Sequence, residues 1–362
     1  MNKIIYYIDV LLAHNVSEEF TYKHETIEKP RVGMIVLAPL RSGEKIGVIT
    51  KVNSVLNDSK IKLKFIKEIS PEYRLNSKMI KFLNWVSNYN LIDRGLVLKM
   101  ILSHSKFYFK KKKTKELTSN IKKNVKAIKL SLEQKRTSQD ILKIFQQRNF
   151  KPVLLDGVPG SGKTEVYFDV IKKFIKDGEQ VLIMFPEVSL TGDFVNRIEE
   201  RFGFSPVVWH SKISTAYKTK VLKSIIDGTS QIIVGARSSL FLPYKNLSMI
   251  VLDEEHDSSY KQEEQGIYHA RDMSVVKSSI EDIPIILTSA TPSLETIFNV
   301  MNKKYNKVSI KNKYFNQEEN EIFIVNMKME KLKKDQWLSE KLIKEISQTL
   351  KKKQQTLLYI NK

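Results

Sequence analysis

The chain has 362 residues, of which 61 are Lys or Arg and 40 are Asp or Glu, so its formal net charge is +21 and its pI is about 9.6. Hydrophobic residues make up 41% and charged residues 28%, a mixture typical of chains that bury a core, which excludes a disordered or fibrous protein. At roughly 100–200 residues per domain, this length predicts two or three domains.

The composition excludes several classes of site. With no cysteine, these residues hold no disulfide, no Cys-ligated zinc and no thiol nucleophile. The first ten residues mix Lys3 and Asp9 into an apolar stretch, unlike a secretory signal, and no apolar run reaches the roughly 20 residues of a membrane span. We therefore expect a cytoplasmic protein without a membrane partner. The basic excess is typical of nucleic-acid binding, although heavy use of lysine also follows from codon bias.

Residues 1–105 have the pattern of a small β-rich domain. Apolar runs typical of strands are separated by turn residues at Ile4–Val10, Gly33–Ala38 and Ile46–Val52. A helix is predicted over Lys78–Tyr89, because apolar residues recur there with the spacing of one helical face. These residues are Met79, Phe82, Leu83 and Val86.

Residues 106–129 form a lysine-rich segment. It contains ten Lys and one Glu, a net charge of 10 − 1 = +9, and the cluster Lys110–Lys113 follows three aromatic residues, Phe107–Phe109. We interpret it as a flexible connector between domains. The alternative is a segment that follows a phosphate backbone while its aromatic rings stack on bases.

From residue 130 onward, apolar strands alternate with helical patterns. Such alternation predicts an α/β fold with a parallel sheet, which we assign to residues 130–312. The predicted strands are Val153–Leu155, Val181–Phe185, Val207–Trp209, Ile232–Val234, Met249–Leu252 and Ile285–Leu287. Residues 313–362 differ from this pattern of alternating strands and helices, and a last strand is predicted at Thr356–Ile360.

The most specific pattern is a phosphate-binding loop at residues 157–164. It follows a predicted strand and opens a predicted helix, as the G-x-x-x-x-G-K-[ST] pattern requires. Glycines let backbone N–H groups surround phosphates, Lys163 supplies a charge for the β- and γ-phosphates, and Thr164 can ligate Mg²⁺. The candidate cofactor-binding residues here are Gly157, Gly160, Ser161, Gly162, Lys163 and Thr164.

Two further patterns follow at the ends of predicted strands. Met249–Leu252 leads into Asp253, Glu254, Glu255 and His256. In a sheet with a phosphate-binding loop, this position brings Asp253 to the Mg²⁺ and lets Glu254 polarise an attacking water, with His256 alongside. The third pattern is Thr288-Ser289-Ala290-Thr291-Pro292, at an edge of an α/β sheet where ligands bind. Together they indicate NTP hydrolysis rather than nucleotide binding alone.

The three patterns in this order resemble superfamily 2 helicases, and the segment between the last two narrows the match. Residues 253–262 and 268–272 closely resemble the PriA family of replication-restart helicases. The segments 156–167, 186–191, 235–241 and 289–295 agree with it in order.

The resemblance implies an ATP- and Mg²⁺-dependent DNA helicase that moves 3′ to 5′ on branched, forked or single-stranded DNA. Single-strand-binding protein and primosome proteins would be its partners, and the nucleoid its location. Gln134 would read adenine, and residues 1–105 would bind a 3′ DNA end. By the same likeness, the residues that contact DNA or relay its binding are Phe20, Tyr22, Lys64, Arg237, Ser238, Tyr260, Lys261, Tyr268, Arg271, Ser289 and Thr291.

The chain also departs from the family pattern. Pro159 stands where the family has Thr, Gly192-Asp193 replaces Pro-Gln, and residues 106–129 are too few for the family's winged-helix domain. Residues 355–362 resemble the first strand of the second motor lobe, after which the family has a paired-cysteine zinc domain. We therefore expect a truncated member that binds ATP and branched DNA but unwinds poorly.

Two other functional classes remain open at this stage. One is a non-catalytic DNA-binding module that keeps the ATP-binding lobe as a scaffold. The other is a P-loop kinase, which the Asp253–His256 and Ser289–Thr291 patterns disfavour.

Overall fold

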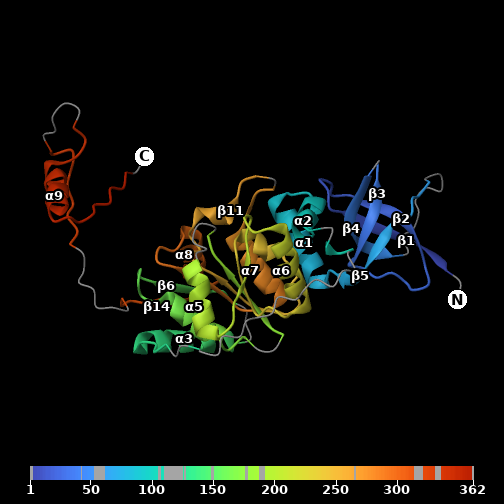
Figure 1. The fold of residues 1–362 in the computed structure, drawn as a ribbon, viewed down its shortest axis with the longest axis horizontal. Coiled ribbons are helices and arrows are strands. Elements are labelled where there is room, and N and C mark those ends of the chain that lie inside the picture. Colours follow the sequence, from blue (N-terminus) through green and yellow to red (C-terminus); the bar gives the residue numbers. More distant parts are fainter. Residues whose placement is uncertain are drawn as a thin grey trace. The chain divides into compact units, whose positions relative to one another are not determined.

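The computed structural model describes residues 3–41, 43–52, 62–104, 107–109, 125, 128–147, 151–175, 178–186, 192–264, 266–313, 321–330 and 336–360. The chain divides into two compact units, Met1–Phe315 and Asn316–Lys362, and each is described by itself. The first unit contains an antiparallel sheet, a pair of helices and a parallel α/β lobe (Figure 1). This confirms the predicted fold class.

The N-terminal sheet has five antiparallel strands in the order β2-β1-β4-β3-β5. Its strands are β1 Ile4–Leu12, β2 Glu19–Thr26, β3 Met34–Leu40, β4 Gly43–Val52 and β5 Glu68–Arg74. Alternate residues of β1 point to a buried cluster in which Ile8, Val10 and Tyr22 are almost fully covered. The predicted helix is α1 Ser77–Asn90, which Asn76 caps by accepting a hydrogen bond from the Met79 N–H, and α2 Arg94–Ile101 follows it.

The lobe is built on seven strands in the order β14-β6-β13-β10-β7-β9-β8, and every pairing is parallel. The strands are β6 Val153–Gly157, β7 Gln180–Met184, β8 Val207–Trp209, β9 Ile232–Gly235, β10 Leu247–Leu252, β13 Ile285–Ser289 and β14 Asn306–Ile310. The helices are α3 Leu132–Phe145, α4 Lys163–Ile171, α5 Gly192–Phe202, α6 Thr215–Asp227, α7 Ala270–Glu281 and α8 Leu294–Met301. A short antiparallel hairpin, β11 Lys261–Gln262 and β12 Tyr268–His269, precedes α7.

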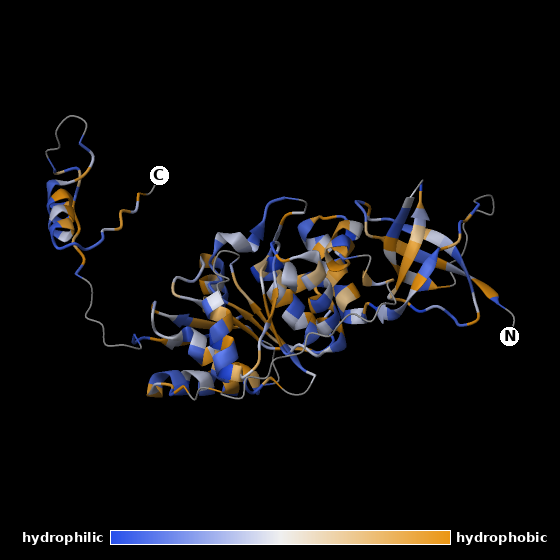
Figure 2. Ribbon diagram, in the orientation of Figure 1, coloured by the Kyte–Doolittle hydropathy of each residue, from blue (hydrophilic) through white to orange (hydrophobic). Residues whose placement is uncertain are grey.

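The strands of the lobe are continuous apolar runs because helices cover both faces of the sheet, and they are largely orange in Figure 2. Since parallel strands share one direction, the carboxyl ends of β6, β10 and β13 meet at one edge. That edge carries the phosphate-binding loop, Asp253 and Ser289.

One hydrophobic cluster runs from the N-terminal helices into the lobe. It includes Phe82 of α1 and Phe241 of the lobe, whose ring centroids are 5.8 Å apart. Phe107 and Tyr108 belong to the same cluster and pack against Tyr73. The alternative of stacking bases on these two rings is therefore wrong, because burial in the core removes them from solvent. Most of the lysine-rich segment lies outside the described residues.

Lys277 of α7 is a charged residue inside this core. Its Nζ lies 4.8 Å from the ring centroid of Phe82 and 5.9 Å from that of Tyr244. Burial lowers the pKa of Lys277 to about 8, against the opposing pull of the Glu281 carboxylate. Burial also raises the pKa of Tyr244 well above its usual value, so that its phenol does not titrate near pH 8.

We predict that Lys277→Met stabilises the protein at pH 7 by about 1–3 kcal/mol, because an apolar side chain of similar length avoids burying the charge. The folded pKa is depressed, so the cost of the charge is complete below pH 8 and declines as pH rises to the unfolded pKa of about 10.4. Urea unfolding of both proteins at pH 7 and pH 10 measures this. A difference between the two proteins that fails to shrink at pH 10 would contradict the assignment.

The second unit contains α9 Glu340–Lys351, capped by Ser339. The prediction of a strand at Thr356–Ile360 is wrong for this structure: residues 354–360 are exposed and irregular. An apolar run forms a strand only when a neighbour takes its backbone hydrogen bonds, and no described strand pairs with it. In the described part of the chain, we find no helix with the length and apolar character needed to span a membrane.

Candidate nucleotide-binding site

The phosphate-binding loop connects β6 to α4. Gly160 and Gly162 have φ angles of +77° and +81°, and Gly162 caps α4. A Cβ atom at Gly162 would collide with Nε2 of Gln134, so both conformation and space require glycine. The N-terminus of α4 therefore directs free backbone N–H groups and a positive potential at the loop, as anion binding requires.

A cavity of about 760 Å³ lies against this loop, lined among others by Lys163, Thr164, Asp253 and Glu254. The Lys163 ammonium is nearly buried and donates to the Gly157 carbonyl at 2.7 Å. Ser161 Oγ is buried and has no hydrogen-bond partner among the described residues. This orphaned hydroxyl, the glycine loop and the cation together fit a polyphosphate.

Three hydroxyl groups hold Asp253. Tyr167 on α4 donates to Asp253 Oδ2 at 3.1 Å, and Thr288 donates to Oδ1. Tyr260 donates to the Asp253 carbonyl at 2.6 Å and to the Met184 carbonyl at 3.0 Å. Burial raises the pKa of Asp253, while the Thr288 and Tyr167 hydroxyls and Lys163 oppose the rise. The carboxylate is thus fixed in one orientation, as a ligand for a divalent cation must be.

Glu254 differs from its neighbour in exposure. Its backbone is left-handed, with φ +47°, and its side chain lines the cavity with 41% of its surface exposed. Burial, and then the charge of Asp253, raise the pKa of Glu254. A raised pKa makes a carboxylate a stronger proton acceptor, so the two adjacent acids suit different tasks.

His256 joins the Asp253–His256 segment to the end of β13. Ser289 Oγ and His256 Nδ1 are 2.8 Å apart, and the same ring nitrogen is 3.6 Å from Glu254 Oε2. The Thr291 N–H donates to Ser289 Oγ at 3.0 Å. A displacement of this strand end would therefore reach Glu254 through one imidazole.

Gln134 forms the capping box of α3 with Ser131. Its Oε1 accepts from the Ser131 N–H, and its Nε2 donates to the Ser161 carbonyl at 3.0 Å. The side chain lines the cavity but is almost fully buried. Its carboxamide thus supports the phosphate-binding loop in this structure, and reading of adenine stays a prediction.

Two residues of the site were missed by sequence reasoning. Tyr167 lies four residues after Lys163, on the same face of α4, a spacing that could have indicated it. Arg197 on α5 lines the cavity and donates from Nη2 to Glu165 Oε1 at 2.9 Å. Arg201, one turn further along α5, is buried, and its Nε lies 3.9 Å from Oε2 of the same Glu165 carboxylate. Only the packing of α5 on α4 reveals these arginines.

The residues predicted to relay DNA binding lie in the segment that follows β10 and in the 3₁₀ helix after β9. Arg237 Nη1 donates to the carbonyls of Ser259 and Lys261, at 3.0 and 2.7 Å, and so holds the hairpin that precedes α7. Ser238 follows it in the same 3₁₀ helix, Arg237–Phe241. Lys261 is exposed, and its Nζ lies 3.3 Å from Glu263 Oε1.

Tyr260 and Tyr268 are buried, at 1% and 3% exposure, so neither ring is open to DNA. Tyr268 packs edge-on against Phe241. Arg271 is also buried, and its Nη1 lies 3.4 Å from Glu255 Oε2. These three side chains pack inside the protein, and the role predicted for them, relaying DNA binding to the nucleotide site, stays a prediction.

The three residues of the N-terminal domain that were predicted to contact DNA differ in their exposure. Tyr22 is buried, and its hydroxyl donates to the Pro39 carbonyl at 3.0 Å, while Phe20 packs partly against the same cluster. The predicted contact by Tyr22 is corrected, because its ring belongs to the core of the sheet. Lys64 is exposed on a loop, with Nζ 3.5 Å from the Arg41 carbonyl. Residues 187–191, which belong to a segment of the family resemblance, lie outside the described residues.

Two family models match the chain. One describes a DEAD/DEAH box helicase and matches residues 131–300, and the other describes a 3′ DNA-binding domain and matches residues 9–103. Among solved structures, the chain is similar to RecG bound to a three-way DNA junction, at 18% identity and a TM-score of 0.39, over 65% of this chain and 30% of that one.

Curated relatives extend over more of the chain. The replication restart protein PriA of Rickettsia felis is 39% identical over 332 residues, which are 91% of this chain and 50% of the relative. That of Bacillus subtilis is 36% identical over 241 residues, 66% of this chain and 30% of the relative. The chain thus spans about half the length, or less, of these relatives. On the two matched models and the extended identity, it belongs to the PriA family.

Proposed function

We propose that this chain is the DNA-end-binding domain and ATP-hydrolysing lobe of a 3′-to-5′ DNA helicase of replication restart, acting at forked or branched DNA. The observation that carries the proposal is the Asp253–Glu254 pair at the phosphate-binding loop, in one compact unit with the segment that matches the 3′ DNA-binding model. Its partners would be forked and single-stranded DNA, single-strand-binding protein and primosome proteins.

The residues of the cavity divide the work of ATP hydrolysis. Lys163 and the free N–H groups of the loop would hold the phosphates, and Thr164 and Asp253 would hold Mg²⁺. Bound Mg²⁺ supplies charge neutralisation at the phosphates. Glu254 would accept the proton of the attacking water at its carboxylate, and Arg197 would contribute a further positive charge at the cavity wall.

An ATPase assay with and without DNA tests this function. We expect magnesium-dependent hydrolysis that forked DNA stimulates and that small-molecule phosphate acceptors do not. Fork binding should weaken as salt rises, because lysine contacts to phosphates release counterions. Salt-sensitive fork binding without hydrolysis would instead favour the non-catalytic module, and hydrolysis indifferent to DNA would favour a phosphotransferase.

A further inference from the structure

The N-terminal domain and the lobe are joined along one stripe of α7. Met273, Lys277 and Glu281 recur every four residues, so they share a helical face. Near the start of α7, Met273 Sδ accepts a hydrogen bond from Asn90 Nδ2 at 3.4 Å. At its end, Lys78 Nζ donates to the Glu281 carbonyl at 2.8 Å and lies 3.6 Å from the Glu281 carboxylate. Because Asn90 is the last residue of α1 and Lys78 lies in its first turn, the two helices pack antiparallel, and we call this contact the α1–α7 seam.

The middle of the seam is apolar except for one ammonium. Lys277 Nζ lies over the ring of Phe82 and 3.9 Å from Met79 Sδ, both on α1. An apolar residue would fill this place without the cost of burying a charge, so stability alone does not account for the lysine. Both ends and the centre of α7 are thus tied to α1 by directional contacts.

The other end of the linkage is the catalytic strand. Arg271, in the first turn of α7, lies 3.4 Å from Oε2 of the fully buried Glu255, the residue that follows Glu254. Glu255 Oε1 accepts from the Ser293 N–H at 2.7 Å, and its Oε2 accepts from the Thr296 hydroxyl at 2.9 Å. Since its backbone N–H also donates to the Thr288 carbonyl at 2.9 Å, a shift of Arg271 would act on the segment that carries Glu254.

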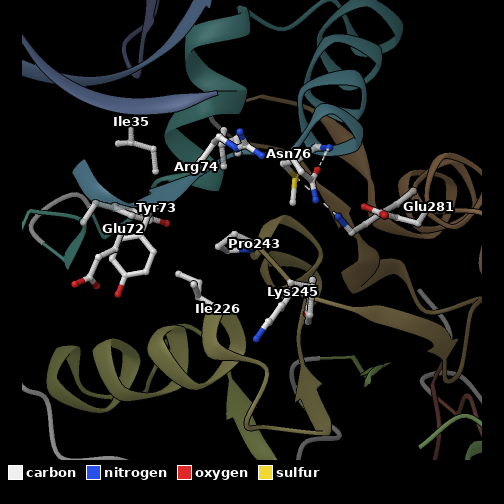
Figure 3. Close-up of a pocket in the computed structure, with 14 residues that line it drawn as sticks. Ile35, Glu72, Tyr73, Arg74, Asn76, Ile226, Pro243, Lys245 and Glu281 are labelled. Atoms are coloured by element: carbon white, nitrogen blue, oxygen red, sulfur yellow. Dashed lines mark hydrogen bonds between the residues drawn. The ribbon is translucent and has the colours of Figure 1, made fainter. Parts of the chain in front are cut away.

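The seam is packed along its stripe but open on one flank. A cavity of about 220 Å³ lies beside it, between Ile35, Glu72 and Arg74 of the N-terminal domain and Ile226 and Pro243 of the lobe (Figure 3). Met79, Lys277 and Glu281 of the seam line this cavity. α7 is about 18 Å long, so a displacement at its α1 contacts would be carried along one rigid helix to Arg271.

We propose that the α1–α7 seam makes α7 the link by which a DNA end bound to the N-terminal domain positions Glu254 for ATP hydrolysis, with Lys78, Lys277 and Arg271 as positioning residues. The inference rests on the proposed function and names how that site is regulated.

The test is the charge reversal Lys78→Glu, which sets two carboxylates against each other at Glu281. Its controls are Lys78→Arg, which keeps the ion pair, and Lys81→Glu, the same reversal at an exposed position of α1. ATPase rates are measured without DNA, with a fork ending in a 3′-hydroxyl and with the same fork ending in a 3′-phosphate. We expect Lys78→Glu to keep the basal rate and to lower the stimulation specific to the 3′-hydroxyl by about fivefold or more.

Linkage supplies a second readout that does not require hydrolysis. If the seam couples the sites, a non-hydrolysable ATP analogue must change the affinity for 3′-hydroxyl DNA, and by fluorescence anisotropy this change should disappear in Lys78→Glu. Phe82→Ala, which removes the ring over Lys277, should act in the same direction; if it does not fold, Lys78→Glu decides.

Unchanged stimulation in Lys78→Glu, or an equal loss in Lys81→Glu, would overturn the proposal. If none of the DNAs stimulates the wild-type ATPase, the proposed function is contradicted instead. In that case the analogue still tests the seam, because a wild-type DNA affinity that does not respond to it means that no coupling exists.

Discussion

Lys163→Ala is expected to weaken ATP binding by about 100-fold and to remove ATP hydrolysis. The ammonium is nearly buried beside the phosphate-binding loop, and Gly157 alone supplies a carbonyl partner at 2.7 Å among the contacts described for it. A hydrogen bond to a charged group contributes about 1.5–3 kcal/mol, which corresponds to this loss of affinity. Isothermal titration with ATP and Mg²⁺ measures the change directly.

DNA affinity is the control for this variant. Lys163 lines the nucleotide cavity and not the N-terminal domain, so fork binding in the absence of nucleotide should be nearly unchanged. Lys143→Ala, which removes an exposed lysine paired with Asp140 on α3, provides the matched loss of one positive charge. A collapse of fork binding in Lys163→Ala, but not in Lys143→Ala, would show that the cavity itself binds DNA.

Glu254→Gln should lower kcat for ATP by about 10²–10⁴ while ATP affinity is retained. The amide keeps the size of the side chain but cannot accept a proton, and Asp253 remains held by Tyr167 and Thr288 for Mg²⁺. Single-turnover hydrolysis separates this loss from binding. The exposed Glu264→Gln is the control, and an equal loss in both variants would remove Glu254 from its role.

The proposed function also predicts a pH dependence of hydrolysis by the wild-type protein, which follows from the same residue. Burial and the charge of Asp253 raise the pKa of Glu254 above that of an ordinary glutamate. A proton acceptor works only when ionised, so kcat should fall as the pH is lowered through this raised pKa. This acidic limb should be absent from the residual activity of Glu254→Gln.

The sequence predicted the parts of the site that depend on local pattern. A phosphate-binding loop needs only a strand, glycines and a helix that are adjacent in the chain, so Gly162 and Lys163 were identified together. The positions of Asp253 and Ser289 followed from the rule that parallel strands end at one edge. Each of these inferences uses short range or a general property of sheets.

The sequence did not predict the contacts that depend on packing between segments distant in the chain. An aromatic residue in a polar or basic segment has the same pattern whether it stacks on a base or fills a core, and Tyr108, Tyr22 and Tyr260 all proved to be buried. The hydrogen bond from Tyr260 to the Asp253 carbonyl depends on how a seven-residue loop folds back, and Arg197 reaches the cavity only because α5 packs beside α4. No local pattern encodes either contact.

The strand order of the lobe also bears on how the protein is made. Among the described strands, β6, which carries the phosphate-binding loop, pairs only with β13 and β14, and these strands lie about 130–150 residues later in the chain. On a ribosome, β6 would therefore emerge long before either neighbour and expose its backbone and apolar side chains meanwhile. Nascent chains that end before Ile285 should be unable to retain ATP, and chaperones that bind exposed strands would have their main period of action in that interval.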